Sequence, residues 1–435
     1  MHSQIQYPFS TDLQQPMVTT KRDNLLINDT RLRHDFDALA EIGATVDGGV
    51  SRLALSNEDL QARAWLADRF EAAGIFVRDD DAGNLSGVLP TNKPDALTLM
   101  IGSHLDSVPN GGRYDSSVGV LAGLEVLRTI SEAGIDLPFH LEAINFTDEE
   151  GCWHSLFGSR ALTGTLDNDY LNDRDGDHGP FRAALFRAGI RPADVHRARR
   201  DPATLAGYLE VHIEQGRRLD QQGYDIGVVT SIVGRTTYQL TFYGEASHSG
   251  TTVMEDRRDA LHGAATFITE AFKLVDTEFT DGVFNCGSME VNPGSFNVIP
   301  AVARLTMECR HTDGERMTTM ESALIRLAQE IAVERRLTVN VKRDSHMPVI
   351  NLHPAFIQAT TTACEHLHLK HTQLISYAGH DAQTLGQVTH AGMIFIPSVE
   401  GISHSPREFT EWPHVVKGVN ALLHTVLELA KRGVG

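Results

Sequence analysis

The chain is poor in cysteine and has no long apolar run. Its 435 residues include only 4 cysteines, which are Cys152, Cys286, Cys309 and Cys364. They lie far apart with no Cys-x-x-Cys pair, which argues against a disulfide framework and indicates free thiols in a reducing compartment. No apolar stretch approaches the roughly 18 residues of a transmembrane helix. The opening residues, MHSQIQYPFS, lack the basic and apolar regions of a signal peptide, so we expect a cytoplasmic protein.

Basic residues are also scarce relative to acidic ones. There are 38 Lys and Arg against 57 Asp and Glu, and the formal net charge is −19. This balance argues against a nucleic-acid-binding protein and against binding to an anionic membrane surface. The hydrophobic content of 41% and the charged content of 22% are ordinary for a soluble globular enzyme. The length predicts two domains.

Short apolar runs alternate with segments of helical spacing through most of the chain. Strands are expected at 98–103, 141–147, 207–213, 373–379 and 392–398. Helices are expected at 32–43, 60–74 and 119–134. The alternation indicates an α/β fold with a mostly parallel sheet that is covered on both faces. The first 25 or so residues are polar and aperiodic, and are predicted to form a tail or strap.

Residues 236–345 break this alternation. Their pattern predicts the order β-α-β-β-α-β, which is typical of a ferredoxin-like unit. The third element of that order is expected as one strand at 284–291. We therefore expect a catalytic domain formed by residues 1–230 and 346–435, with a lid or dimerisation domain, residues 231–345, inserted into it.

Four predicted strands of the large domain end in histidine or carboxylate residues. These are His104 with Asp106, Asp148 with Glu149 and Glu150, His212 with Glu214, and His404, while Asp115 follows in the first of these loops. In open α/β sheets, ligands bind outside the carboxyl ends of the strands. A single such residue is more often solvated or capping, but four strand ends together predict a shared site.

The residue types at these strand ends indicate a metal centre. Imidazole and carboxylate groups without thiolate suit Zn²⁺, Mn²⁺, Co²⁺ or Ni²⁺. Three histidines and two carboxylates are too many for one four-coordinate catalytic metal with an open position. They fit two divalent metal ions per subunit that share a bridging carboxylate.

The motifs that carry these residues resemble a known family. The chain is similar to the metal-dependent amidohydrolases of the hydantoinase/carbamoylase branch of the M20 peptidases. This branch includes N-carbamoyl-L-amino-acid hydrolases, β-ureidopropionases and allantoate amidohydrolases. The resemblance extends from GGVSRLALS to GISHSPREFT, with the motifs GSHLDSVPNGGRYD, FTDEEG, HIEQG, GEASHSGTT with RRDA, NVIP and GHDA. It implies a metallo-exopeptidase-like catalytic domain, a ferredoxin-like lid and a homodimer formed through that lid.

The resemblance also implies which residues bind metal. The five implied ligands are His104, Asp115, Glu150, His212 and His404. Asp115 would bridge the two ions. His104 and His212 would complete the first ion, and Glu150 and His404 would complete the second.

Two further carboxylates receive roles near the metals. The resemblance makes Glu149 the general base, and adjacent residues on an extended segment do point to opposite sides. Asp106 would hydrogen-bond the imidazole of His104 and hold its tautomer. The alternative for Asp106 is an aspartate that caps a turn.

Other residues are implied to bind the substrate. His248 would reach the partner subunit's site and stabilise the oxyanion, although by itself it could be an exposed loop histidine. Arg310 and Asn297 would bind the substrate's carboxylate, for which a guanidinium offers a planar fork. A structural salt bridge is the alternative for Arg310. Gln215 is implied as a substrate contact, and Arg235 near the hinge is a further candidate.

The sequence departs from the family in three places. Ser116 stands where glycine is usual, and Val253 stands where proline usually follows GTT. Cys152, Trp153 and His154 replace the usual x-[RK]-[FY] after the glutamate pair. None of these changes removes an implied ligand, so we expect activity but leave the exact substrate open.

The sequence thus predicts a hydrolase of a linear carbon–nitrogen bond in a small carboxylate-bearing substrate, foremost an N-carbamoyl-L-amino acid. The enzymatic alternatives are an allantoate or β-ureidopropionate amidohydrolase, or an M20-type aminoacylase or dipeptidase. The motifs HIEQG and GISHSPRE favour the ureido-acting branch. An inactive binding protein on the same scaffold is the alternative outside enzymes, and the intact ligand set argues against it.

Overall fold

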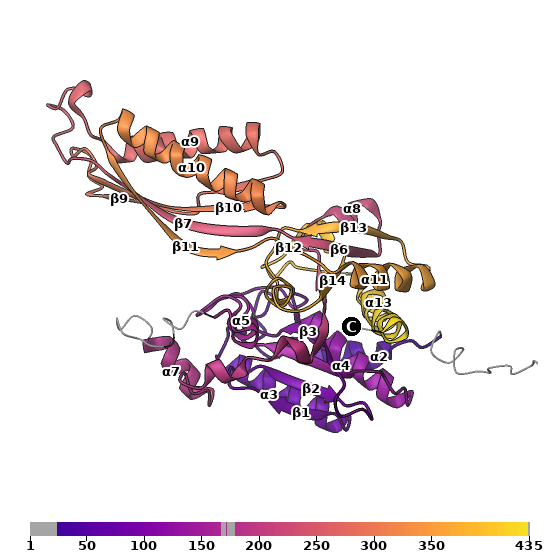
Figure 1. Cartoon of the computed structure of the whole chain (residues 1–435). Helices are drawn as coiled ribbons and strands as arrows, with labels where there is room; N and C mark the ends of the chain where they lie inside the picture. Colours follow the sequence, from indigo (N-terminus) through magenta and orange to yellow (C-terminus); the bar gives the residue numbers. More distant parts are fainter. Residues whose placement is uncertain (1–23, 167–170, 172–178, 434–435) are drawn as a thin grey trace, which may run out of the picture.

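A computed structural model describes residues 24–166, 171 and 179–433. Most of the predicted N-terminal tail, residues 1–23, lies outside these described residues. The described residues form a nine-stranded sheet and a five-stranded sheet, each with its own helices (Figure 1). Within this part of the chain, no helix combines the length and the apolar character needed to cross a membrane.

The nine-stranded sheet confirms the predicted α/β class. Its order is β1 (Phe76–Asp79), β2 (Leu85–Leu89), β4 (His140–Phe146), β3 (Thr98–His104), β5 (Leu205–Ile213), β14 (Ala391–Ile396), β6 (Ile226–Ile232) and β12 (Ile350–Asn351), with β13 (His371–Ser376) also paired to β6. The central strands β4, β3, β5 and β14 are parallel to one another. Antiparallel pairs occur toward the edges, where β1 and β2 form a short hairpin that the sequence pattern did not predict.

Helices cover both faces of this sheet. One face packs against α2 (Asp29–Ala40), α3 (Asn57–Ala72), α4 (Ser117–Glu132), α11 (Pro354–His366) and α13 (Trp412–Arg432). The other face packs against α5 (Phe157–Thr163), α8 (Arg218–Gln222) and α12 (Asp381–Leu385). Strand β3 shows the alternation directly, since Leu99 and Ile101 enter the first core and Met100 enters the second. A strand buried on both faces is apolar throughout, which explains the run LTLMI.

Shorter elements complete the large part of the chain. They are α7 (Gly179–Arg187) and the 3₁₀ helices η1 (Val195–Ala198), η2 (Pro202–Thr204) and η4 (Val399–Gly401). A separate core forms around α5, α7 and η1, and it includes Phe157 and Phe181. This core lies beside the loop that follows β4.

The five-stranded sheet is antiparallel and has the predicted element order with one difference. The elements are β7 (Gly234–Tyr243), η3 (Met254–Asp256), α9 (Ala260–Glu278), β8 (Val283–Asn285), β9 (Met289–Asn292), β10 (Val302–His311), α10 (Gly314–Glu334) and β11 (Thr338–Met347). The strand expected at 284–291 is two strands, because β8 and β9 pair with different ends of β10 and residues 286–288 pass between them. Helices α9 and α10 share one core and lie together on one face of the sheet, which extends away from the large sheet (Figure 1).

This topology determines where the site can form. Strands β4, β3, β5 and β14 are consecutive in the sheet and parallel, so their carboxyl ends share one edge. Strand β7 follows β6, which runs antiparallel to β14, and Arg235 near the start of β7 lines the same cavity as His104 and His404. The loops that carry the predicted ligands therefore meet the first residues of the smaller sheet.

Candidate metal centre and substrate cavity

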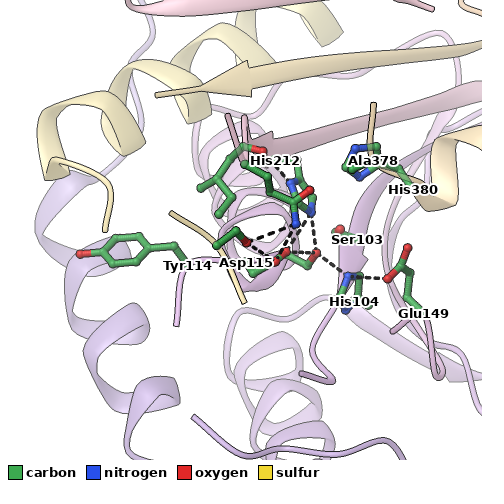
Figure 2. A network of polar contacts seen from close by, with 12 residues as sticks. Ser103, His104, Tyr114, Asp115, Glu149, His212, Ala378 and His380 are labelled. Atoms are coloured by element: carbon green, nitrogen blue, oxygen red, sulfur yellow. Dashed lines mark hydrogen bonds and ion pairs between the residues drawn. The ribbon is translucent and has the colours of Figure 1, made fainter. Parts of the chain in front are cut away.

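His104, Asp115 and His212 form the first cluster of ligand-type atoms. One ligand-type atom from each lies within 4.8 Å of those of the other two. His104 ends β3 and His212 lies near the end of the neighbouring β5, while Asp115 enters from the loop before α4. Figure 2 shows the three side chains meeting, with Glu149 beside His104. His212 Nε2 is 3.0 Å from Asp115 Oδ1.

The tautomers of both histidines are set by the backbone. His104 Nδ1 lies 3.0 Å from the carbonyl oxygen of Asp106, and His212 Nδ1 lies 2.8 Å from that of Ile213. A carbonyl oxygen only accepts, so Nδ1 carries the hydrogen in each neutral ring. Each Nε2 is then an acceptor that faces Asp115, as a metal-binding nitrogen requires.

Asp115, Glu150 and His404 form a second cluster of the same kind. Their ligand-type atoms also lie within 4.8 Å of one another. His404 Nε2 is 3.5 Å from Asp115 Oδ2 and 3.6 Å from Glu150 Oε2. Asp115 thus belongs to both clusters and offers one oxygen to each. Because imidazole nitrogens and carboxylate oxygens converge from all these residues, the donor set fits divalent cations of the zinc and manganese type.

The structure contains a third group of potential ligands, Glu210, His212 and His380. Both oxygens of Glu210 are already used, since Ser103 Oγ donates to Oε1 at 2.7 Å and Ala382 N donates to Oε2 at 3.0 Å. We therefore interpret Glu210 as a buried support for the strand ends rather than a metal ligand. The sequence analysis missed it, although its place two residues before His212 on β5 was a usable signal.

Glu149 and Glu150 follow β4 and are mostly buried. Glu149 Oε2 lies 3.2 Å from His104 Nε2. Burial raises the pKa of Glu149 well above its ordinary value, opposed by His104 and reinforced by Asp381 and Glu150. Burial and the adjacent Asp115 raise the pKa of Glu150 to about 7. The surroundings of Glu149 therefore favour its protonated form more than those of an exposed glutamate.

Asp106 supports the glutamate pair. Its Oδ1 accepts from Glu149 N at 3.3 Å, and its Oδ2 accepts from Glu150 N at 3.2 Å. The atom of Asp106 nearest to His104 Nδ1 is the backbone carbonyl oxygen at 3.0 Å, whereas the carboxylate is 3.5 Å away. His104 Nδ1 thus faces both the carbonyl and, at a longer distance, the carboxylate of Asp106, and the carboxylate also orients the residues after β4.

Gln215 and Glu408 both help to hold Asp115 in place. Gln215 Nε2 donates to Asp115 Oδ2 at 2.9 Å. Glu408 Oε1 accepts from the backbone nitrogens of Tyr114 and Asp115, both at 2.9 Å, and its other oxygen accepts from Ser403 Oγ at 2.9 Å. Glu408 thereby joins the Asp115 loop to the loop that carries His404. Glu408 belongs to the motif GISHSPRE, whose pattern did not predict this role.

Both clusters open into a cavity of ≈ 320 Å³ that two arginines also line. Arg235 on β7 and Arg310 on β10 are directly paired in the register of these strands. Arg310 also makes the salt bridge that was the alternative interpretation, with Nε 2.8 Å from Glu308 Oε1. It still lines the cavity, so the salt bridge and a role toward a ligand are compatible.

His248 and Asn297 do not line this cavity. Both are exposed, and a β-bridge between His248 and Val298 places them next to each other in the smaller unit. His248 Nδ1 accepts from the backbone nitrogens of Gly250 at 3.0 Å and Thr251 at 3.2 Å. The Nε2–H of the neutral ring is therefore directed outward as a donor.

The departures after the glutamate pair pack away from the cavity. Trp153 stacks on Phe181 with ring centroids 5.8 Å apart, and its Nε1 donates to Ala54 O at 3.0 Å. Ser155 and Leu156 line the cavity instead. Val253 is 57% exposed in the smaller unit.

Comparison with known proteins agrees with this geometry. The profile of peptidase family M20/M25/M40 matches residues 100–428. An N-carbamoyl-L-amino acid amidohydrolase of Geobacillus stearothermophilus is 37% identical over 408 residues, covering 93% of this chain and 100% of the relative. An allantoate amidohydrolase of Bacillus subtilis is 31% identical, covering 90% of this chain and 95% of its own. The crystal structure of a hydantoinase/carbamoylase family amidase from Burkholderia multivorans superposes with a TM-score of 0.81 at 34% identity, covering 93% of this chain and 98% of that one.

Proposed function

Because the chain belongs to peptidase family M20/M25/M40, in its hydantoinase/carbamoylase branch, we propose that it hydrolyses the ureido carbon–nitrogen bond of N-carbamoyl-L-amino acids. One observation carries this proposal. Two histidine–carboxylate clusters share Asp115 and open into the same cavity as two arginines. A cavity lined by metal-type ligands and by two arginines suits a small substrate that has both a scissile carbonyl and a carboxylate.

Two divalent cations are proposed to occupy the clusters. His104 and His212 would hold one, Glu150 and His404 would hold the other, and Asp115 would contact both. When bound, such ions supply Lewis-acid polarisation of the scissile carbonyl and ease the deprotonation of water. Zinc, manganese, cobalt and nickel all suit these ligand types.

Glu149 is proposed to move the proton of the reaction. Its carboxylate takes a proton from the attacking water at an Oε atom and later returns it to the leaving nitrogen. The raised pKa supports this role, since the protonated form must be accessible near neutral pH. The contact of Glu149 with His104 and the hydrogen bond from its backbone nitrogen to Asp106 keep the carboxylate at the edge of the cluster.

Arg310, Arg235 and Gln215 are proposed to orient the substrate. A guanidinium can bind the substrate's carboxylate through two parallel N–H groups. The amide nitrogen of Gln215 donates to Asp115 Oδ2. Its buried Oε1 has no hydrogen-bond partner among the described residues. That oxygen is available to accept from an N–H of the ureido group.

Residues 231–345 are proposed to form a lid and dimerisation domain on a catalytic domain of residues 1–230 and 346–435. His248 would donate its outward Nε2–H to the oxyanion in the partner subunit's site. Asn297 lies beside His248 and would accompany it to the same substrate. We further propose that the enzyme works as a cytoplasmic homodimer.

The experiment that tests this function is a substrate panel on metal-loaded protein. We expect highest kcat/KM with an N-carbamoyl-L-amino acid, measured against its D-enantiomer, allantoate, β-ureidopropionate, an N-acetyl amino acid and a dipeptide, with Zn²⁺, Mn²⁺, Co²⁺ or Ni²⁺ added. Allantoate is the second candidate because of the Bacillus subtilis relative. Highest turnover of a dipeptide would contradict the proposal. No turnover of any substrate together with no metal uptake would favour a non-catalytic binding protein.

A further inference from the structure

Ser116 lies inside the first metal cluster. It stands between Asp115 and the first residue of α4, with a left-handed backbone (φ 54°), and it is fully buried. Its Oγ is 2.5 Å from His104 Nε2, 2.8 Å from His212 Nε2 and 3.1 Å from Asp115 Oδ1. The hydroxyl therefore contacts every residue of the cluster at the atom that faces the ion.

These three contacts of the Ser116 hydroxyl cannot all be hydrogen bonds at the same time. In the neutral rings, which are the form that binds metal, both imidazole Nε2 atoms are acceptors, because each Nδ1 donates to a backbone carbonyl. Asp115 Oδ1 is an acceptor as well. A serine hydroxyl carries one proton, so it can donate to only one of the three. In the other two contacts, the lone pair of the ligand-type atom faces the serine oxygen with no proton between them. A bound cation would remove this unfavourable contact.

The distances show where the hydroxyl lies relative to that cation. A metal ion takes histidine nitrogen and oxygen ligands at about 2.1 Å, so two ligands of the same ion stand about 3.0–3.4 Å apart. The Oγ distances to the two Nε2 atoms are shorter than this separation. Ser116 Oγ thus lies closer to both imidazoles than another ligand of the same ion would, while its 3.1 Å distance to Asp115 Oδ1 is within the ligand–ligand range.

We propose that Ser116 weakens cation binding at the His104–Asp115–His212 position, so that the Asp115–Glu150–His404 position fills first. This inference depends on the proposed metal centre. For an ion to enter the first position, the Ser116 side chain must rotate away and lose its hydrogen bond inside a packed site. At the second position, Gln215 Nε2 lies 2.9 Å from Asp115 Oδ2 and 3.5 Å from His404 Nε2, and Ser403 Oγ lies 3.0 Å from Asp115 Oδ2. Neither group contacts all three residues of that cluster, as Ser116 does in the first, and His404 is half-exposed. The two ions would therefore bind with different affinities although their ligand sets are similar.

The test is metal titration of chelator-treated protein, followed by calorimetry and by metal analysis after dialysis, with Mn²⁺ or Zn²⁺ as the probe. We expect the wild type to bind one tight and one weak ion per subunit. Ser116→Ala and Ser116→Gly should tighten the weak ion about tenfold, equivalent to the loss of roughly one hydrogen bond that must otherwise be broken. The tight ion should be unchanged.

Two controls make the result specific. Ser107→Ala also removes a buried hydroxyl, one that accepts from Arg52 N at 2.9 Å, and should bind both ions as the wild type does. His404→Ala should lose the tight ion and keep the weak one. Weaker binding in both Ser116 variants would identify the serine as a ligand and overturn the inference, as would two equal sites in the wild type. If no form of the protein binds metal, the proposed centre itself is wrong, and this inference with it.

Discussion

Asp115 is the residue on which both metal positions depend. Burial by itself would raise the pKa of its carboxyl group, but the imidazoles of His212, His404 and His104 hold the pKa well below its ordinary value. Asp115 therefore remains a carboxylate at any pH near neutrality. The side-chain amide of Gln215 donates to its carboxylate, and Glu408 accepts from its backbone nitrogen. These contacts fix the orientation of Asp115, as a carboxylate shared by two ions requires.

Glu149→Gln should separate metal binding from turnover. The substitution keeps the size of the side chain and removes its ability to accept a proton, so we expect kcat to fall about 10²- to 10⁴-fold. Metal content should match the wild type, because Glu149 belongs to neither ligand cluster. The measurement is kcat together with metal analysis of the same preparation.

Glu214→Gln is the matched control for this prediction. Glu214 also follows a strand of the central sheet, but its carboxylate accepts from Arg218 N and Leu219 N at the start of α8. We expect turnover close to that of the wild type. Undiminished activity in Glu149→Gln would remove Glu149 from the proton-transfer role.

At the scale of elements, strands β7 and β10 of the smaller sheet bring two arginines to the cavity that the metal-type clusters line. Their antiparallel pairing places Arg235 opposite Arg310 at the end of the smaller sheet that faces the cavity. The rest of β10 extends away from the site, and Arg304 on the same strand is exposed and lies 3.8 Å from Glu290. Position along one strand thus decides which arginine can reach a substrate.

Arg310→Ala should lower kcat/KM for an N-carbamoyl-L-amino acid about ten- to hundredfold, because it removes hydrogen bonds between charged groups. Arg304→Ala, six residues earlier on β10, should leave kcat/KM unchanged. An N-carbamoyl amine without a carboxylate should be a poor substrate for the wild type and no poorer for Arg310→Ala. Equal losses for both substrates would show that Arg310 acts on the fold of the site rather than on the carboxylate.

At the scale of the whole molecule, the exposed position of His248 predicts that activity requires two chains. Glu149→Gln and His248→Ala homodimers should each be nearly inactive. A mixed dimer contains one site with both groups intact and one site that lacks both, so mixing and reassembly should restore up to about half of the wild-type activity per mixed dimer. The measurement is activity against the ratio of the two variants, with dimer formation followed by light scattering. Absence of recovery in dimers that have formed would contradict the role of His248 across the interface.

The buried acids predict how the metal-free protein responds to pH. Burial, with Asp106 next in effect, raises the pKa of Asp148 to about 8, and burial with Glu210 raises that of Asp381 to about 8. Burial raises the pKa of Glu408 to about 7, with Asp115 next in effect. For an acid whose pKa is raised on folding, the stabilisation is complete below the unfolded pKa and is lost as pH rises through the folded pKa.

We therefore expect the Tm of chelator-treated protein to fall as pH rises from about 5 to about 8. Added Mn²⁺ or Zn²⁺ should raise the Tm more at pH 8 than at pH 6, since protons compete with metal for the imidazole and carboxylate ligands. Asp381→Asn should flatten the metal-free profile, because it removes one of the titrating groups. Thermal unfolding followed by calorimetry measures all three, and a metal-free Tm that rises across this range would contradict the prediction.

The sequence by itself determined the α/β class. Apolar runs such as LTLMI have the length of a strand, and they are apolar throughout, as strands buried on both faces are. Its motifs also indicated the family. The rule for strand ends, which needs no coordinates, predicted that His104, His212 and His404 meet at one edge of the sheet. Periodicity further predicted the element order of the smaller sheet. It could not show that residues 284–291 divide into two strands, because that division depends on the pairing with β10.

Only the tertiary structure decided how the side chains face one another. The contact of Asp106 through its carbonyl, the clamp of Glu408 on the Asp115 loop and the Ser116 hydroxyl between two imidazoles all join residues or groups whose approach depends on loop direction. The sequence gives the spacing of the residues in a loop, but it does not give the backbone angles that direct their side chains. At Ser116 a single positive φ turns the hydroxyl into the cluster, and local sequence alone does not specify that angle for a residue other than glycine.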